Sequence, residues 1–189
     1  MSMTLLIVLG VIVLLLLFGV AIYNRLVRLR ALVKEGFSGI TVQLRRRADL
    51  IPNLVETVKG YASHEKATFE AVTAARGAAT GGGVAATAAA DATMTSLIGR
   101  LFAVAEAYPE LQADENFRQL QSEMSAIEGE LQSSRRYYNA TARDLNTRIQ
   151  SFPDLFFARP LGFTEEEYYK DEDPAIQVAP KVSFDKPAA

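Results

Sequence analysis

The stretch LLIVLGVIVLLLLFGVAIY, residues 5–23, decides the architecture, because none of its 19 side chains carries a charge. As a helix it would rise about 28 Å, which is close to the thickness of the hydrocarbon core of a bilayer. Its Leu, Ile, Val and Phe residues favour insertion by about 0.3 to 0.6 kcal/mol each, or roughly 5 to 9 kcal/mol together. The stretch predicts a transmembrane helix, and we place the anchor at residues 1–24.

A cleaved signal peptide is the alternative interpretation of this apolar run. The head MSMT has no basic side chain, however, and no clear A-x-A cleavage pattern follows the run, so an uncleaved anchor fits better. The basic side chains that flank the run all follow it, at Arg25, Arg28, Arg30 and Lys34. The positive-inside rule therefore puts the rest of the chain in the cytoplasm, and we expect these four side chains to contact anionic lipid.

The residues after the anchor have a helical pattern, with apolar side chains three or four positions apart and breaks that contain Pro or Gly. Four apolar stripes result: Leu26 to Leu44, Leu54 to Val72, Met94 to Tyr108 and Phe117 to Phe152. Such helices pack naturally as an antiparallel four-helix bundle, which we expect over residues 25–158. The fourth helix, residues 115–151, would be about 55 Å long and the third about 25 Å, so the bundle should be uneven. Its apolar spacing is close to that of a coiled coil.

The stretch RRRADLIPNL, residues 45–54, contains a proline within a helical pattern. Proline is tolerated in the first turn of a helix, and Asp49 three positions earlier would be a good N-cap, so we predict a helix joint at Asp49 and Pro52. The arginines would then end the preceding helix, where positive charge is favourable. The alternative is a basic contact surface, and we take Arg45, Arg46, Arg47 and Asp49, together with the fourth helix, as the candidate subunit interface.

The inventory of reactive side chains is small, because the chain has no cysteine and one histidine, His64. His64 and Glu65 do not begin an HExxH zinc motif, since position 68 is Thr. We therefore predict no catalytic, cofactor-binding or metal-binding residue and no enzymatic activity. The stretch SSRRYYNA, residues 133–140, has residue types that bind nucleic acid, but its place in the long helix and the net charge of −2 favour packing instead.

Residues 159–189 form an acidic tail that contains proline. From residue 165 onward it has seven acidic and three basic side chains, so an anionic membrane surface would repel it. Its last apolar piece, VAPKVSF at residues 178–184, could dock in a groove or be disordered, and the sequence leaves both open.

Several blocks of the sequence, among them RRADLIPNLVETVKGYA, LFAVAEAYPELQADENFRQLQ and PKVSF, closely resemble the LemA family of bacterial membrane proteins. The resemblance covers residues 23–184. It departs at Gly36, Gly39 and Thr41, where helix formers and an acid are expected, which suggests a weaker or closely packed first helix. The resemblance implies a membrane-anchored helical bundle on the cytoplasmic side of the inner membrane, without established catalytic residues. Its relatives include proteins linked to magnetosome membrane formation and others encoded beside a membrane stress metalloprotease.

Three features favour a non-catalytic scaffold that self-associates and organises or remodels the bacterial inner membrane. They are the anchor, the basic side chains that follow it and the small inventory of reactive side chains. The alternative is a regulatory adaptor or sensor that presents its bundle to a membrane protease or signalling partner. The expected partners are anionic lipids, further copies of the chain and another membrane protein, but no nucleic acid and no cofactor.

Overall fold

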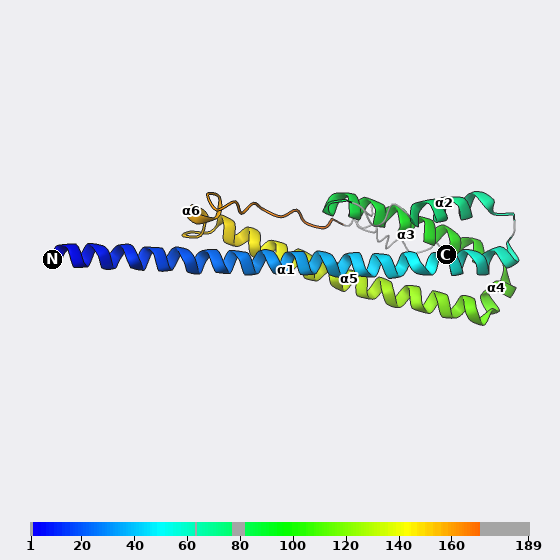
Figure 1. Ribbon diagram of the computed structural model, residues 1–189. Coiled ribbons are helices and arrows are strands. Elements are labelled where there is room, and N and C mark those ends of the chain that lie inside the picture. Colours follow the sequence, from blue (N-terminus) through cyan, green and yellow to red (C-terminus); the bar gives the residue numbers. More distant parts are fainter. Residues whose placement is uncertain (1, 63, 77–81, 171–189) are drawn as a thin grey trace, which may run out of the picture.

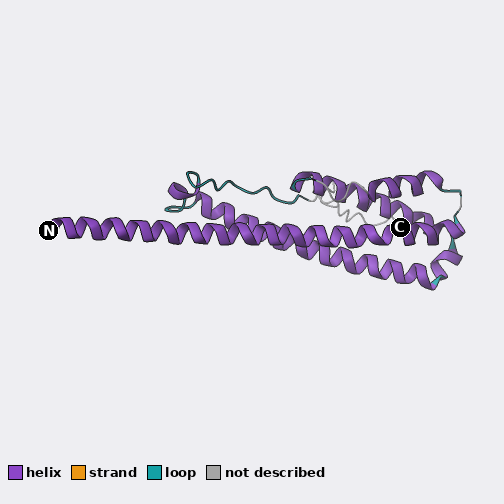
Figure 2. Ribbon diagram, viewed as in Figure 1, coloured by secondary structure: helices purple, strands orange, loops and turns teal. Residues whose placement is uncertain are grey.

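The computed structural model describes residues 2–62, 64–76 and 82–170, and every regular element within them is a helix (Figure 2). In chain order these are α1 (Met3–Tyr61), α2 (Lys66–Arg76), α3 (Val84–Glu106), α4 (Pro109–Ala113), α5 (Glu115–Gln150) and α6 (Leu155–Ala158). The all-α prediction is confirmed for this part of the chain. The long helices α1 and α5 lie side by side and run in opposite directions (Figure 1).

Helix α1 is one unbroken element of 59 residues, about 88 Å long. Its N-terminal part projects beyond the rest of the molecule (Figure 1), and the large apolar side chains there are exposed. This part is long and apolar enough to cross a membrane, by length and composition. Beyond it the same helix becomes amphipathic and buries Leu26, Val33 and Ile40. The expected boundary between anchor and body at residue 24 therefore separates two surfaces of one helix, without a break in the backbone.

The body, meaning the described residues from 25 onward, has two apolar cores along α1. The core nearer the N-terminal part joins α1, α5 and the segment after α5, and the start of α3 reaches it. The second core joins α1, α2, α3, α4 and the start of α5. Helix α2 and most of α3 cover only the far half of α1 (Figure 1), so the antiparallel four-helix bundle that we expected over 25–158 is not confirmed for the described residues.

The predicted helix joint at Asp49 and Pro52 is wrong. Both residues are exposed and lie inside α1, which continues to Tyr61. A proline inside a helix costs about 3 kcal/mol, because it lacks an N–H and its ring crowds the preceding turn. Continuing the helix buries Ile51 and Leu54 completely, and each such side chain stabilises the fold by about 1.5 to 3 kcal/mol. Burial of this face outweighs the local cost of the proline.

The ends of the other helices follow the sequence more closely. The second predicted helix is divided between the end of α1 and α2, with the break before Lys66. Helix α3 ends at Glu106, shortly before Pro109, and α5 spans 36 residues and ends just before residue 151, as its pattern predicted. The Asp114 carboxylate caps α5 by accepting a hydrogen bond from the N–H of Phe117 at 2.9 Å.

Helices α1 and α5 approach each other closely at Gly36. A Cβ at this position would lie 3.0 Å from Tyr138 Cα and 3.3 Å from Tyr137 Cδ1, so a larger residue would push the backbones apart. At Gly39 the nearest atom, Ser134 Oγ, would be 3.7 Å away, which is an ordinary contact. Of the two explanations for these glycines, close packing is confirmed at Gly36.

The described part of the predicted tail follows α6 and runs along the body as an extended chain to residue 170. Residues 166–169 of this chain are hydrogen-bonded to α5. The remaining tail, including the VAPKVSF piece, falls outside the described residues.

Candidate functional site

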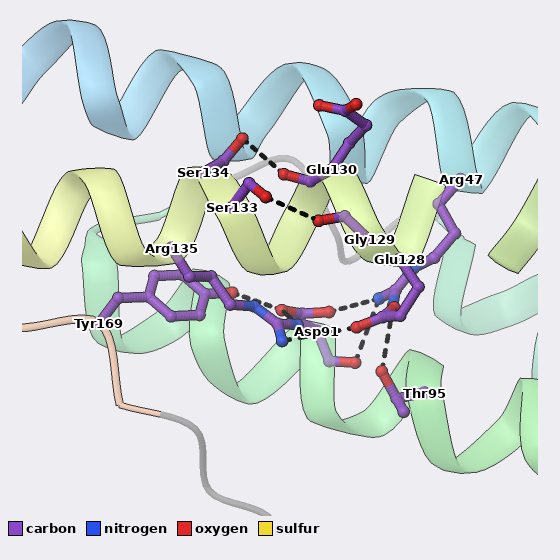
Figure 3. A network of polar contacts seen from close by, with 10 residues as sticks. All are labelled: Arg47, Asp91, Thr95, Glu128, Gly129, Glu130, Ser133, Ser134, Arg135 and Tyr169. Atoms are coloured by element: carbon purple, nitrogen blue, oxygen red, sulfur yellow. Dashed lines mark hydrogen bonds and ion pairs between the residues drawn. The ribbon is translucent and has the colours of Figure 1, made fainter. Parts of the chain in front are cut away.

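A buried carboxylate, Asp91 of α3, lies where α1, α3 and α5 meet (Figure 3). Its Oδ1 accepts a hydrogen bond from Arg47 Nη2 of α1, and its Oδ2 accepts one from Arg135 Nη2 of α5. Arg47 Nη2 also donates to the backbone carbonyl of Asp91 at 3.3 Å. Asp91 and Arg47 are each 2% exposed, so this contact is almost fully removed from water.

Two further side chains complete the ion network around Asp91. Arg47 Nη1 donates to Thr95 Oγ1 and to Glu128 Oε2, both at 3.1 Å. Arg135 Nη1 lies 3.5 Å from Glu128 Oε1. Two guanidinium groups thus face two carboxylates and their charges cancel. Because an unpaired buried charge costs several kcal/mol, this arrangement is stable only while the three helices stay together.

Tyr169, from the extended segment, closes the network on its outer side (Figure 3). Its hydroxyl donates to Asp91 Oδ2 at 2.6 Å, and the Arg135 guanidinium lies 5.6 Å from the centre of its ring. Burial raises the pKa of the Tyr169 hydroxyl, and the hydrogen bond and negative charge of Asp91 raise it further. The hydroxyl is therefore a neutral donor that connects the extended segment to Asp91 of α3, while the ring contacts Arg135 of α5.

Two asparagines on α5 hold the same segment through its backbone. Asn139 donates to the carbonyl of Tyr169 at 2.9 Å and accepts from its N–H at 2.8 Å. Asn146 makes the same pair of bonds with Glu166, both at 2.8 Å. Seven residues of helix rise about 10.5 Å and three residues of extended chain about 10 Å, so the two spacings match. The asparagine side chains thus make the hydrogen bonds that a neighbouring strand would make to an extended backbone.

Tyr138 adds a third backbone contact in the same row. The side chain is fully buried, and its hydroxyl donates to the carbonyl of Glu167 at 2.6 Å. Burial raises the pKa of Tyr138 to about 12, with smaller contributions from the charges of Glu166 and Glu167. Together with the asparagines, this contact fixes residues 166–169 on α5.

The site is suited to holding parts of the chain together rather than to acid–base chemistry. Both carboxylate oxygens of Asp91 are already engaged by three donors, so neither is open to a substrate proton. Among the described residues there is no group of three or more His, Cys, Asp and Glu side chains that could hold a metal ion. His64 is exposed, as expected for a surface histidine.

The four basic side chains expected at the lipid surface have two different surroundings. Arg25, Arg28 and Lys34 are exposed on α1, just beyond the apolar part. Arg30 is half-buried, and its guanidinium lies 4.7 Å from the centre of the Phe163 ring. Three of the four are therefore open to a lipid surface, while Arg30 packs on the start of the extended segment.

The candidate subunit interface loses one of its residues. Arg45, Arg46 and Asp49 are exposed on α1, and Asp49 is 3.7 Å from Arg76 of α2. Arg47 does not belong to this surface, because the helical period turns the third arginine of the run into the core. The run therefore contains a surface pair and a buried ion-network residue.

Asp91, Arg47 and Tyr169 were not predicted from the sequence to form one network. A signal was present, because Asp91 lies on the apolar stripe of α3, between buried Thr87 and Met94. Arg47 likewise lies on the buried face of α1. One charge of each sign on two apolar stripes suggests a buried ion pair. The packing interpretation of residues 133–140 is confirmed for Tyr138.

By fold and site, the chain is a helical, membrane-associated protein with one candidate membrane-spanning helix and, among its described residues, no cluster of side chains that could hold a metal ion. It belongs to the LemA family, whose model matches residues 36–184. The resemblance seen in the sequence is thereby confirmed.

Three relatives give the scale of the similarity. Magnetosome protein MamQ 2 of Paramagnetospirillum magneticum is 27% identical over 177 residues, covering 79% of this chain and 65% of the relative. Magnetosome protein MamQ of Magnetospirillum gryphiswaldense is 26% identical over the same coverage. Protein LemA of Metamycoplasma hominis is 27% identical over 131 residues, 68% of this chain and 60% of the relative. The chain thus spans somewhat less than two-thirds of the length of these relatives.

Proposed function

We propose that this protein is a membrane-anchored, non-catalytic scaffold that self-associates and organises or remodels the bacterial inner membrane, with its body in the cytoplasm. The observation that carries the proposal is the continuity of α1, which joins the apolar part to the body without a break. A body connected in this way keeps a fixed direction relative to its own anchor. Contacts between neighbouring bodies then act on the membrane directly.

Exposed basic side chains at the start of the body support an anionic lipid surface as one partner. Arg25, Arg28 and Lys34 are exposed immediately after the apolar part. Basic side chains at such a surface contribute about 1 kcal/mol each. Their position after the span also favours a cytoplasmic body by the positive-inside rule.

Self-association is supported by complementary charges at one height along the body. Arg45 and Arg46 are exposed on α1, and Glu130 is exposed on α5. Because α5 is antiparallel to α1 and Arg47 bonds to Glu128, Glu130 lies at nearly the same distance from the membrane as Arg45. Copies anchored side by side in one membrane therefore bring opposite charges together at one level. Such complementarity gives specificity more than affinity.

The relatives point in the same direction by name. Two of these relatives are magnetosome proteins, which are 27% and 26% identical to the chain over the aligned residues. We extend from them only the association with a membrane structure.

A regulatory adaptor is the second candidate, and a surface groove favours it. The groove has a volume of about 840 Å³, lies between α1 and α2, and is lined by Lys59, Lys66, Phe69, Glu70, Thr73 and Ala74. It is on the half of the body remote from the apolar part (Figure 1), where a protein partner would have access.

Electron cryo-microscopy of detergent-free inner-membrane vesicles containing the full chain, combined with crosslinking, tests the proposal. We expect regular assemblies of the chain, and their loss when Arg45→Glu and Arg46→Glu are combined, because like charges then meet at the interface. The control combines Lys66→Glu with Arg100→Glu, which makes the same change in charge on α2 and α3. Monomers crosslinked to a different protein would instead favour the adaptor, and unchanged assemblies in the α1 variant would remove that surface from the interface.

A further inference from the structure

Helix α6 lies directly beside the last turns of the apolar part of α1 (Figure 1). The rings of Phe18 and Phe157 meet edge to face with their centres 6.4 Å apart. A Cβ on Gly19 would lie 3.6 Å from Phe157 Cε1. Phe163, just after α6, packs on Tyr23 with ring centres 5.8 Å apart. The chain therefore returns from α5 to the level of residues 18–23.

The outer side of this return carries large apolar side chains that face away from the body. Phe152 is 80% exposed, Phe156 67% and Leu161 46%. Phe152 and Phe156 pack on one another, with ring centres 6.0 Å apart. Clustered exposed apolar groups of this kind mark a contact with another apolar phase or partner. We call residues 152–161 the aromatic foot.

Its charges are arranged for the edge of a bilayer. The aromatic foot contains two charged residues, Asp154 and Arg159. Asp154 is buried and lies 3.2 Å from Arg148 of α5, so it presents no bare charge to the outside. Arg159 is exposed, and a long arginine side chain can extend to the headgroups from a position slightly below them.

The position of the aromatic foot along α1 indicates which apolar surroundings its exposed side chains contact. Gly19 precedes Arg25, the first charged residue of α1, by six positions, which is about 9 Å along the helix. If residues 5–23 cross a bilayer, any element in contact with residues 18 and 19 lies at the boundary between acyl chains and headgroups. No protein partner is needed to cover the phenyl rings there.

We propose that the aromatic foot inserts into the lipid interface, as a second membrane contact beside the span in the same leaflet. The inference rests on the proposed membrane anchoring and names the lipid acyl boundary as the partner of Phe152, Phe156 and Leu161. Two contacts that are far apart in the sequence then hold α1 and α5 at the membrane. The body is restrained against rotation about the axis of its anchor.

The chain contains no tryptophan, so single substitutions give a clean probe. Phe156→Trp in the full chain, reconstituted in lipid nanodiscs with brominated phospholipid, should emit at short wavelength and lose most of its fluorescence. Tyr61→Trp is the matched control, because Tyr61 is an aromatic residue with 40% exposure at the far end of α1, and its emission should persist. Leu14→Trp, inside the span, marks insertion of the anchor itself.

The outcomes separate the two proposals. Quenching of Leu14→Trp without quenching of Phe156→Trp would overturn the aromatic foot and leave the anchor intact. Absence of quenching in both would overturn the anchor as well. A second measurement uses the absence of cysteine: Phe152→Cys should react with a water-soluble maleimide several-fold more slowly in nanodiscs than Tyr61→Cys. Equal rates would contradict insertion.

Discussion

Asp91 is a single carboxylate that fixes four separate parts of the chain. It binds Arg47, Arg135 and Tyr169, and its own helix supplies the backbone contact to Arg47. Replacing a complete buried ion network by apolar residues can be neutral, but removing one member leaves its partners charged and buried. The network therefore favours the correct packing of the helices over incorrect arrangements, and it adds little net stability.

Asp91→Asn should destabilise the full chain by about 3 to 5 kcal/mol, because the guanidinium groups of Arg47 and Arg135 then share only Glu128. Asp49→Asn is the matched control, since Asp49 is exposed and its ion pair with Arg76 is long. Its effect should stay within about 0.5 kcal/mol. Chemical unfolding in detergent micelles, followed by far-ultraviolet circular dichroism, compares the two, and similar midpoints would disprove the importance of the network.

Gly36 and Gly39 of α1 should respond in opposite directions to alanine. Gly36→Ala places a methyl group against the backbone of Tyr138 and should cost about 1 to 3 kcal/mol by overpacking. Gly39→Ala meets only an ordinary contact and should gain about 0.5 to 1 kcal/mol from helix propensity. Thermal unfolding of both variants tests this, and destabilisation by Gly39→Ala equal to that by Gly36→Ala would place the close approach elsewhere.

The pH dependence at alkaline pH should report the docking of the extended segment. The pKa of Tyr138 is raised by burial from 10.0 to about 12, so the folded chain holds this proton more tightly than the unfolded chain. Its contribution to stability is complete below pH 10 and is lost as the pH rises toward 12. Tyr138→Phe should therefore be less stable at neutral pH by about 0.5 to 1.5 kcal/mol, yet lose less stability across this interval. Thermal melting at several pH values in this interval is the measurement. Equal losses of stability in the two proteins would contradict the assignment.

At the scale of the element, α1 shows how burial decides where a helix ends. Its sequence contains a run of three arginines and a proline, each of which locally indicates that a helix ends or bends. The helix nevertheless continues, because its buried stripe keeps the same face from Ile22 to Val58. It ends just beyond that stripe, at Tyr61. Local signals are overruled wherever stopping would expose this face.

Pro52→Ala should stabilise the chain, because it restores a backbone donor in the interior of an exposed helical turn. The gain should be about 1 to 3 kcal/mol, the proline cost less the chain entropy that proline removes from the unfolded state. Asp49→Ala should have little effect, since Asp49 caps no helix. Equilibrium unfolding of both variants is the measurement. A loss of stability with Pro52→Ala would indicate that α1 does begin a new helix there.

Structural features that depend on residues close together in the sequence could be predicted, whereas features that depend on residues far apart could not. The apolar span, the C-terminal end of α3 and the extent of α5 depend on neighbouring residues, and all three were predicted. The ion network joins residues 44 positions apart in two of its bonds and 78 in a third, so no local pattern contains it. The docking of residues 166–169 depends on Asn139 and Asn146, which look like ordinary polar helix positions until their partner is known.

Across the whole protein, the candidate contact sites and the ion network lie at different distances from the apolar end of α1. The aromatic foot and three exposed basic side chains lie nearest to it, the ion network in the middle and the α1–α2 groove beyond. Lipid contacts are thus proposed at one end and protein contacts along the side or at the other end. This separation leaves the sides of the body available to further copies in the same membrane.

The proposed orientation predicts that protease added outside intact spheroplasts leaves the body uncut, while detergent lysis exposes it. Reversing the flanking charges should invert this result, because positive side chains set the orientation of a single span. The variant combines Ser2→Lys and Thr4→Lys with glutamine at Arg25, Arg28 and Lys34. Digestion of the unchanged chain from outside would overturn the cytoplasmic assignment.

The unbroken α1 can also be considered as a mechanical lever. About 57 Å of α1 lies beyond residue 23 and about 31 Å lies up to it. A sideways displacement at Tyr61 therefore acts on the span through a long lever arm. A tilt of about 20°, which is common for membrane helices, moves the far end by about 20 Å. Bilayer thickness influences tilt through hydrophobic mismatch. A thinner membrane would therefore change the spacing of neighbouring far ends without altering any contact inside the protein.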